Sequence, residues 1–377
     1  MNRPPGSAAR AALLALVLVG ATADRGTAQL ADTRAAAGVR LEAYSFGDPE
    51  KVDLERVVLI TVPLTVIVPL TRQLELGING AYARGEVHRG DGSEAALSGP
   101  IDTEVRLTAA LAQDRLRLGI VALLPTGRSE LTAEELDVAG VIAADLLPFA
   151  ISNWGTGGGI GVNAAAAVPV GFNMAVGVSG GYVVTREFEP RSDASFAYRP
   201  GNQLHVRAAL DRSFGSAGKA SLQLIYQQFS QDRSGDANLY QAGDRLQAVA
   251  SYAFAAGATA SGVVYGGYLR RQQGRYAEVV LLTPAQDLIY GGAAVRVPLG
   301  GFVLLPTVDV RVLGNEAGLE QGYTLSAGAG AELPLGRLLL APLARARFGS
   351  LTIREGLDSG FTGFELGFTA RTRRGTP

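Results

Sequence analysis

The stretch that decides the fold reads Ile101-Asp102-Thr103-Glu104-Val105-Arg106-Leu107. Its apolar and β-branched residues occupy the odd positions, and its charged residues occupy the even positions. Successive side chains of a β-strand point to opposite faces, so a period of two predicts a strand with one apolar and one polar face. A helix would instead repeat its apolar residues every three or four positions.

The same alternation recurs along the chain from about residue 38. In residues 204–211, four apolar side chains alternate with His205, Arg207 and Asp211, and residues 74–82, 116–124, 246–254 and 325–333 follow the same pattern. About sixteen such segments of about ten residues can be recognised, and ten residues is the length of a tilted transmembrane strand. The pattern predicts an all-β chain.

Composition narrows the class of protein. The 377 residues include 49 glycines and no cysteine, only 18% are charged, and the formal net charge is −1. The lack of cysteine excludes disulfides, thiolate metal sites and cysteine nucleophiles. A near-zero net charge argues against nucleic acid as a partner, because nucleic-acid binding needs a basic surface. A charged fraction this low is also unusual for a soluble enzyme, in which about a quarter is typical.

The first 28 residues have the features of a targeting segment. Arg3 and Arg10 precede an apolar run over residues 11–21, and small residues suited to cleavage follow at 21–23 and 26–28. This order predicts a Sec-type signal peptide over residues 1–28, followed by one mature domain over 29–377. The apolar run is shorter than the roughly twenty residues of a transmembrane helix. A buried N-terminal helix is the alternative.

The connections between the alternating segments fall into two classes of length. Short turns are marked near Gln73 and at residues 113–114, 169–171, 256–257 and 300–301, whereas longer polar loops cover 85–99, 189–202, 231–243, 272–286 and 314–322. Outer-membrane barrels have short periplasmic turns and longer extracellular loops. Strands can span hydrocarbon only as a closed barrel, since every backbone polar group must be bonded internally. We therefore predict an antiparallel transmembrane barrel of about 14–16 strands in the outer-membrane lipid, with both termini periplasmic.

In such a barrel the polar faces turn inward, because an arginine on the lipid face near the midplane costs about 2–4 kcal/mol. The candidate pore-lining residues share this polar face and carry charge of both signs, so no preference for anions or cations is expected. They are Glu75, Asp102, Glu104, Arg106, Arg117, His205, Arg207, Asp211, Arg245, Asp309, Arg311, Arg345 and Arg347.

Two segments depart from the pattern. Residues 57–70 are apolar on both faces and contain Pro63 and Pro69, so either this strand presents an apolar patch to the lumen or to a plug, or its register is misjudged. Residues 127–155 form one very long loop, in which Thr132 and Glu135 have the spacing of a capping box. We predict a short helix within residues 132–147, which either constricts the pore or lies over the rim.

Two motifs carry a family resemblance. Residues 362–368, Thr-Gly-Phe-Glu-Leu-Gly-Phe, resemble the terminal-strand signal that the barrel assembly machinery recognises, although nine residues follow. With the signal peptide and the alternating strands, residues 38–371 resemble bacterial outer-membrane β-barrel transport proteins. Residues 118–127, which end in Leu-Pro-Thr-Gly, resemble a strand of the outer-membrane transporters of phenol meta-pathway degradation, which implies uptake of small, rather hydrophobic compounds.

No catalytic set is evident in the sequence. Only His88 and His205 are available, and no Gly-x-Ser-x-Gly elbow accompanies them. We therefore expect no enzyme activity, no cofactor and no metal site. The predicted function is a channel or transporter for passive or substrate-selective diffusion of small solutes. The alternative is a structural or adhesive barrel with a closed lumen, and a barrel enzyme is the third possibility.

Overall fold

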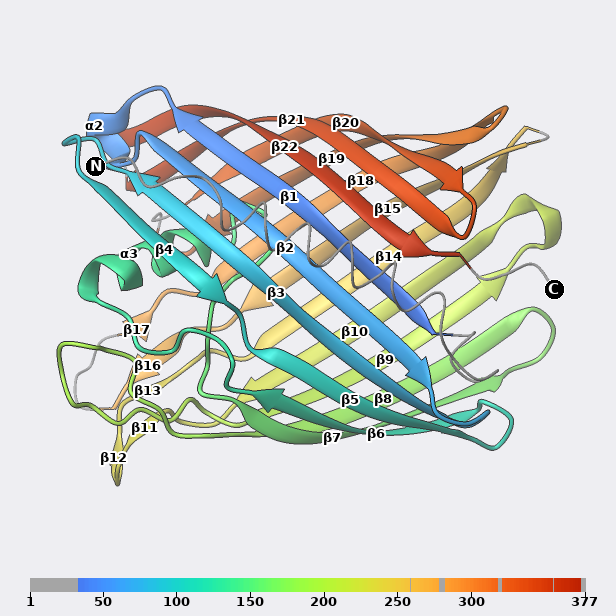
Figure 1. Ribbon diagram of the computed structural model, residues 1–377, viewed down its shortest axis with the longest axis horizontal. Helices are drawn as coiled ribbons and strands as arrows, with labels where there is room; N and C mark the ends of the chain where they lie inside the picture. The colour runs from blue at the N-terminus through green and yellow to red at the C-terminus, as the bar shows by residue number, and fades with distance from the viewer. Residues whose placement is uncertain (1–32, 258, 278–281, 318–320, 355, 374–377) are drawn as a thin grey trace.

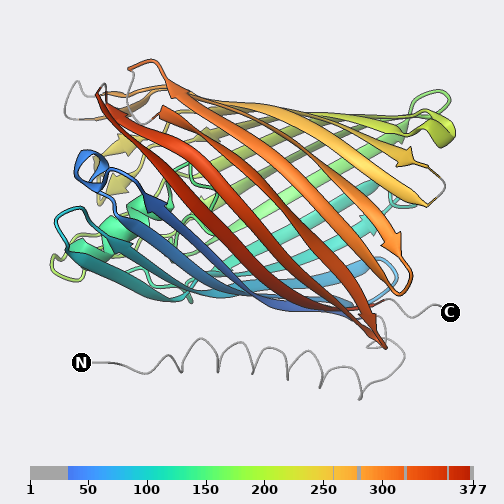
Figure 2. The ribbon, with the colours of Figure 1, turned by 90° about the horizontal axis from the view of Figure 1, so that it is seen from above.

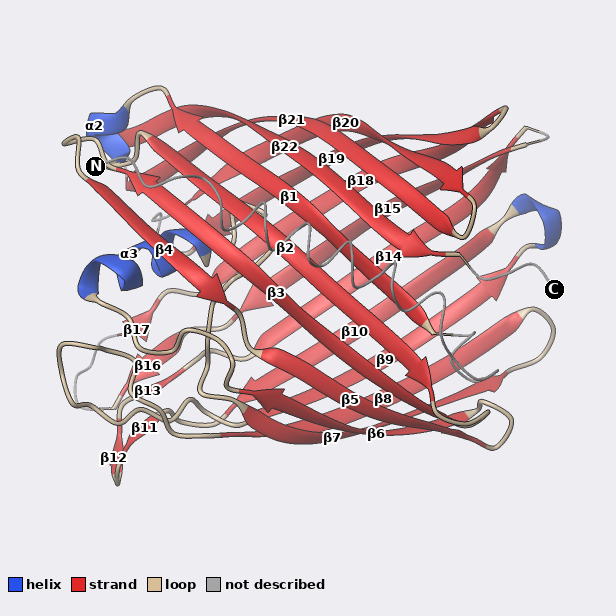
Figure 3. Cartoon of the chain, viewed as in Figure 1, coloured by secondary structure: helices blue, strands red, loops and turns tan. Residues whose placement is uncertain are grey.

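The computed structural model of the protein describes residues 33–257, 259–277, 282–317, 321–354 and 356–373. It is a closed antiparallel barrel of sixteen strands (Figures 1 and 3), which confirms the predicted fold class. Seventeen named strands make up the wall, because β4 and β5 both pair with β3 and together complete one position. The predicted signal peptide, residues 1–28, lies outside the described residues.

The wall strands follow one another around the barrel in chain order, and β22 pairs with β1 to close it. They are β1 Arg34–Phe46, β2 Arg56–Pro69, β3 Leu74–His88, β4 Glu94–Pro100, β5 Thr103–Leu111, β6 Leu116–Leu124, β7 Gly159–Pro169, β8 Met174–Thr185, β9 Gln203–Ser213, β10 Lys219–Phe229, β14 Arg245–Ala256, β15 Ala260–Arg271, β18 Gln286–Leu299, β19 Phe302–Asn315, β20 Gln321–Leu335, β21 Leu338–Arg354 and β22 Leu357–Thr372. The helices are α2 Pro49–Val52, α3 Ala133–Ile142 and the short 3-10 turn η2 Gly215–Ala217. In the described part of the chain, no helix has the length and apolar character needed to cross a membrane.

The outer surface of the barrel is apolar. On β6, Leu118, Ile120 and Leu124 are exposed, while Val121 between them is buried on the other face. The same alternation of exposed apolar residues continues on β7 and β8, where Ile160 and Val178 are more than half exposed. A register without slips carries these side chains around one continuous outer face. Along the middle of these strands, the alternate positions consequently point inward.

The two ends of the barrel differ as predicted. Short turns join β2 to β3, β5 to β6 and β7 to β8 at one end, where β1 begins and β22 finishes (Figure 2). The longer connections gather at the opposite end and include small hairpins: β11 Arg233–Ser234 with β12 Ala237–Asn238, and β13 Tyr240–Gln241 with β16 Gly274–Tyr276 and β17 Leu282–Thr283. The prediction of an irregular loop over residues 85–99 is wrong. That segment forms the paired ends of β3 and β4, because Val87 and Leu97 are buried on the inner face of this hairpin.

The strand that is apolar on both faces has an unbroken register with both of its neighbours. Val57 and Leu59 on its inner face are fully buried in one cluster with residues 131–154 of the long loop. The first of the two interpretations is therefore correct, because β2 presents an apolar patch to material inside the barrel.

Candidate functional site

The long loop contains the predicted helix, α3, and its start is fixed by a capping box. The Thr132 hydroxyl accepts a hydrogen bond from the Glu135 backbone N–H (3.2 Å), and the Glu135 carboxylate accepts one from the Thr132 N–H (3.1 Å). Arg128 donates two further hydrogen bonds to the same carboxylate (2.7 and 2.8 Å). The helix ends at Ile142 rather than continuing to residue 147, and the chain then continues through turns and bends.

The helix packs against the inner face of β3 and β4. Val138 and Ile142 are buried in the same cluster as Val87 and Leu97. Gly85 makes this approach possible, because a Cβ at that position would lie 2.4 Å from Ile142 Cδ1. A larger residue there would push the helix away from the wall. The predicted alternative in which the helix lies over the rim therefore does not hold.

Both ends of the loop are tied to one carboxylate. Asp102, just before β5, accepts hydrogen bonds from the Gly127 N–H (3.0 Å), the Thr156 N–H (2.7 Å) and the Thr156 hydroxyl (2.8 Å). Its own N–H donates to the Trp154 carbonyl (3.0 Å), and the Trp154 indole is buried against β3. We call residues 127–155 the inserted segment, since both of its ends enter the barrel at this anchor.

Beyond the helix, the inserted segment crosses the inside of the barrel. The Ala150 N–H donates to Glu42 on β1 (2.8 Å), and the Leu146 carbonyl accepts from the Thr324 hydroxyl on β20 (3.3 Å). Asp145 forms an ion pair with Arg271 on β15. Contacts with strands so far apart in the wall require the segment to lie across the lumen.

A buried network of ion pairs on the barrel wall supports the inserted segment where it crosses the lumen. Arg347 on β21 is 1% exposed and bridges two carboxylates, Glu42 (3.3 Å) and Glu365 (2.6 Å). Arg40 binds the same two carboxylates, each at 2.9 Å. Because every buried charge has an opposite charge beside it, the desolvation cost of the cluster is offset in place. The network therefore forms a support for the inserted segment.

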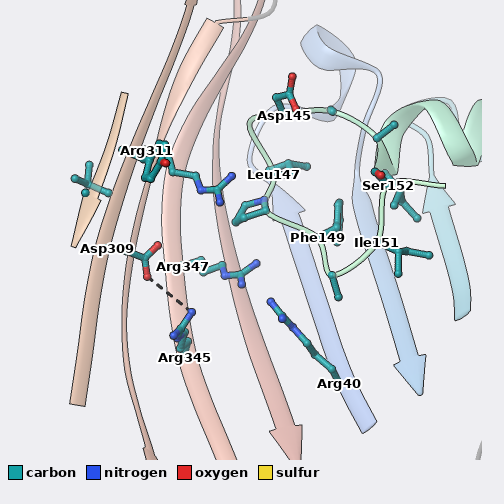
Figure 4. A pocket seen from close by; sticks show the side chains of 18 of the residues that line it. Arg40, Asp145, Leu147, Phe149, Ile151, Ser152, Asp309, Arg311, Arg345 and Arg347 are labelled. Carbon is teal, nitrogen blue, oxygen red and sulfur yellow. Dashed lines mark ion pairs between the residues drawn. The ribbon is translucent and has the colours of Figure 1, made fainter. Parts of the chain in front are cut away.

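A cavity of about 480 Å³ opens between this network and the inserted segment (Figure 4). Among the described residues that line it, four are arginines and two are aspartates. Arg345 pairs with Asp309 at 3.9 Å, but no described acidic side chain forms an ion pair with Arg311. Figure 4 shows these wall residues facing Leu147 and Phe149 of the segment. We call this space the basic cavity.

The strand register places the candidate pore-lining residues on the inner side of the wall, but only some of them lie close together. Asp309, Arg311, Arg345 and Arg347 meet at the basic cavity. The others are spread around the barrel: Asp102 anchors the inserted segment, Glu104 pairs with Arg106 (3.1 Å), Glu75 pairs with Arg34, Asp211 pairs with Lys219 (2.7 Å), Arg245 lies over the Phe229 ring, and Arg117, His205 and Arg207 line β6 and β9 away from the cavity.

Three important residues were missed by the sequence reasoning. Arg40, Glu42 and Glu365 belong to the network, and none of them is among the predicted pore-lining residues. The signal was available for the first two, because they occupy alternate positions of residues 38–44, opposite Val39 and Leu41. Glu365 lies inside the C-terminal pattern and alternates in the same way with Phe364 and Leu366.

One group of described residues has the spacing of a metal site. Ligand atoms of Glu86, His88 and Glu94 lie within 4.8 Å of one another. The register directs these side chains away from the lumen, at the β3–β4 hairpin. Glu86 is already held by Arg84 (2.7 Å), which neutralises its charge. The group is therefore separate from the basic cavity.

Comparisons with known proteins found similarities only to solved structures, at low sequence identity. No family model and no curated protein matches it. Solved structures that resemble it include the anion-selective porin from Comamonas acidovorans (TM-score 0.43, 12% identity, 90% of this chain and 98% of that one) and the outer membrane channel DcaP of Acinetobacter baumannii (TM-score 0.45, 11% identity, 90% and 96%). A triple mutant of the Rhodopseudomonas blastica porin gives a TM-score of 0.41 at 12% identity, with 90% and 99% covered. At this level of similarity, functional conclusions depend on the residues of the chain itself.

Proposed function

We propose that the protein is a bacterial outer-membrane channel through which small solutes diffuse passively, and that the inserted segment narrows the passage. The observation that carries the proposal is a segment held by hydrogen bonds across the inside of a closed barrel whose outer face is apolar. Barrels of sixteen strands are wide enough to leave an aqueous channel, whereas smaller barrels are filled by side chains. No reaction is part of this function.

The outer surface supports a location in the membrane. Exposed apolar residues such as Ile120, Ile160 and Val178 would be unfavourable in water, and in lipid they contact hydrocarbon. The proposal includes export by a signal peptide over residues 1–28 and recognition of β22 by the barrel assembly machinery. The mature protein should fractionate with outer membranes and migrate faster in gels before heating than after.

Apart from Arg347, which is buried, the polar residues predicted from the sequence are proposed to line the water-filled passage around the inserted segment. They carry charges of both signs, and acids and bases facing each other across a lumen create a transverse field that sorts solutes by charge and polarity. The resemblance of residues 118–127 to phenol meta-pathway transporters adds small hydrophobic compounds to the solutes that belong in a transport assay.

The test is electrical and osmotic. Protein refolded into planar bilayers should give discrete single-channel currents, and proteoliposomes should swell in small sugars and amino acids. A correctly folded, heat-modifiable protein that gives neither current nor swelling would favour the structural barrel with a closed lumen. Lipid hydrolysis by the purified protein would favour a barrel enzyme instead.

A further inference from the structure

A second cavity lies on the other side of the inserted segment, toward the end with the long loops. It has a volume of about 550 Å³. Its apolar lining comes from α2, α3 and the wall strands β19 and β21, and includes Val52, Leu54, Val141, Leu313 and Leu351. We call it the apolar cavity. Both cavities fall within the range of volumes that bind small organic molecules.

The charges at the edge of the apolar cavity are already paired. Arg89 is held by Asp53 (3.3 Å) and by Asp137, and Arg271 is held by Asp145. These pairs add little net charge to the cavity wall. A solute that enters this cavity therefore meets mainly hydrocarbon surface, and its apolar part gains from leaving water.

The two cavities are neighbours. Ala143, Ala144, Asp145 and Leu147 line both of them, so one short stretch of the inserted segment separates the apolar cavity from the basic cavity. A small molecule in the basic cavity lies on one side of this stretch, against the apolar side chains of Leu147 and Phe149.

The basic cavity offers unequal arginines. Arg347 is buried and fully engaged by its two carboxylates, so it is not free to bind a solute. Arg40 and Arg345 remain about a third and a quarter exposed. Arg40 shares both of its carboxylates with Arg347, whereas Arg345 shares Glu365 and also pairs with Asp309 (3.9 Å). Arg311 faces the cavity without an ion pair to a described acid. A guanidinium in this situation favours a carboxylate, which it can bind through two parallel hydrogen bonds.

We propose that the basic cavity is a binding site for small organic monocarboxylates with an apolar body, such as aromatic acids. The carboxylate binds at Arg311, with Arg40 and Arg345 beside it, and the apolar body lies against Leu147 and Phe149 of the inserted segment. This proposal deepens the proposed function, since it names the solutes that the constriction selects. The site discriminates such anions from neutral apolar molecules, which lack the charge, and from small hydrophilic anions, which lack the apolar body.

The experiment measures binding by calorimetry on the folded, full-length protein in detergent. Benzoate, benzyl alcohol and acetate are the probes, because each of the last two lacks one of the two recognised features. Benzoate should bind at least tenfold more tightly than either of the others. Trp154 is the only tryptophan of the chain and lies in the inserted segment, so its fluorescence gives a second readout.

Two variants test which side chains bind the carboxylate and the apolar body of the ligand, and a third variant is the control. Arg311→Gln should weaken benzoate binding at least tenfold, and Phe149→Asn should weaken benzoate while leaving acetate unchanged. The control is Arg296→Gln, which also removes one positive charge from the inner face of β18 but lines neither cavity. It should bind benzoate as the wild type does. Heat-modifiable migration verifies that each variant is folded.

Equal affinity of the wild type for benzoate and benzyl alcohol, or an unchanged affinity in folded Arg311→Gln, would overturn the proposal. The comparison of probes needs no variant, so it stands even if a substitution prevents folding. Binding of benzoate without any single-channel current would remove the proposed channel function but support the site. Current without selective binding of benzoate would support the channel function and overturn the proposed site.

Discussion

Reversing the two faces of one strand tests the orientation of the entire wall. Val105 lies on the outer face of β5 between Ile78 and Ala122, and Arg106 lies on the inner face between Gly77 and Val121. We predict that Val105→Arg destabilises the protein in a bilayer far more than Arg106→Val does. The first change puts a guanidinium against lipid, and the second removes an inward charge.

The expected magnitudes differ clearly. An arginine on the lipid face costs about 2–4 kcal/mol near the midplane, which lowers the folding equilibrium constant about 30-fold to 700-fold. Arg106→Val breaks only the half-exposed pair with Glu104 (3.1 Å), which is worth about 0–1 kcal/mol. The assay is reversible urea unfolding in phospholipid vesicles. Equal losses in the two variants, or a larger loss in Arg106→Val, would show that the faces are assigned wrongly.

Three further predictions concern the inserted segment and the outer loops. Replacing residues 132–147 by a short glycine–serine link should raise single-channel conductance in a barrel that still assembles, and an unchanged conductance would remove the constriction. Glu42→Gln should cost about 3–5 kcal/mol in urea unfolding, because it leaves a buried arginine without one of its carboxylates, whereas Glu75→Gln, in a half-exposed pair, should cost about 0–1 kcal/mol. Burial and a hydrogen bond to Asp232 (2.6 Å) raise the pKa of Tyr198 above its usual value of 10.0. The packing of the loop that carries Tyr198 against the loop that carries Asp232 should therefore be complete below pH 10 and lost as the pH rises through the raised pKa. Protease protection measures this packing. Tyr198→Phe should remove the dependence on pH.

Much of the barrel could be predicted because each strand carries its own signal. The alternation of Val105 and Arg106 sets two faces without reference to any other part of the chain, and the short turns reveal which strands are neighbours. The helix start was equally local, since Thr132 and Glu135 are three residues apart and bond to each other. Predictions of this kind need only the geometry of one element.

The contacts that hold the inserted segment across the lumen could not be predicted, because they join residues far apart in the sequence. Nothing near Ala150 indicates that its N–H reaches Glu42, and nothing near Arg347 indicates that two carboxylates from the first and last strands surround it. The error over residues 85–99 has the same origin. The segment is polar and glycine-containing, and only Val87 and Leu97, buried in the same cluster as α3, show that it is a hairpin.

The position of the ion network explains how closing the barrel and placing the inserted segment depend on each other. Glu42 on β1 and Glu365 on β22 face each other directly across the seam where the barrel closes. Two carboxylates in that arrangement repel, so the seam is destabilised until Arg40 and Arg347 bridge them. Once they are bridged, the second oxygen of Glu42 accepts the Ala150 N–H and fixes the segment above the seam. The contact between Ala150 and Glu42 therefore joins the inserted segment to the seam at which the first and last strands pair.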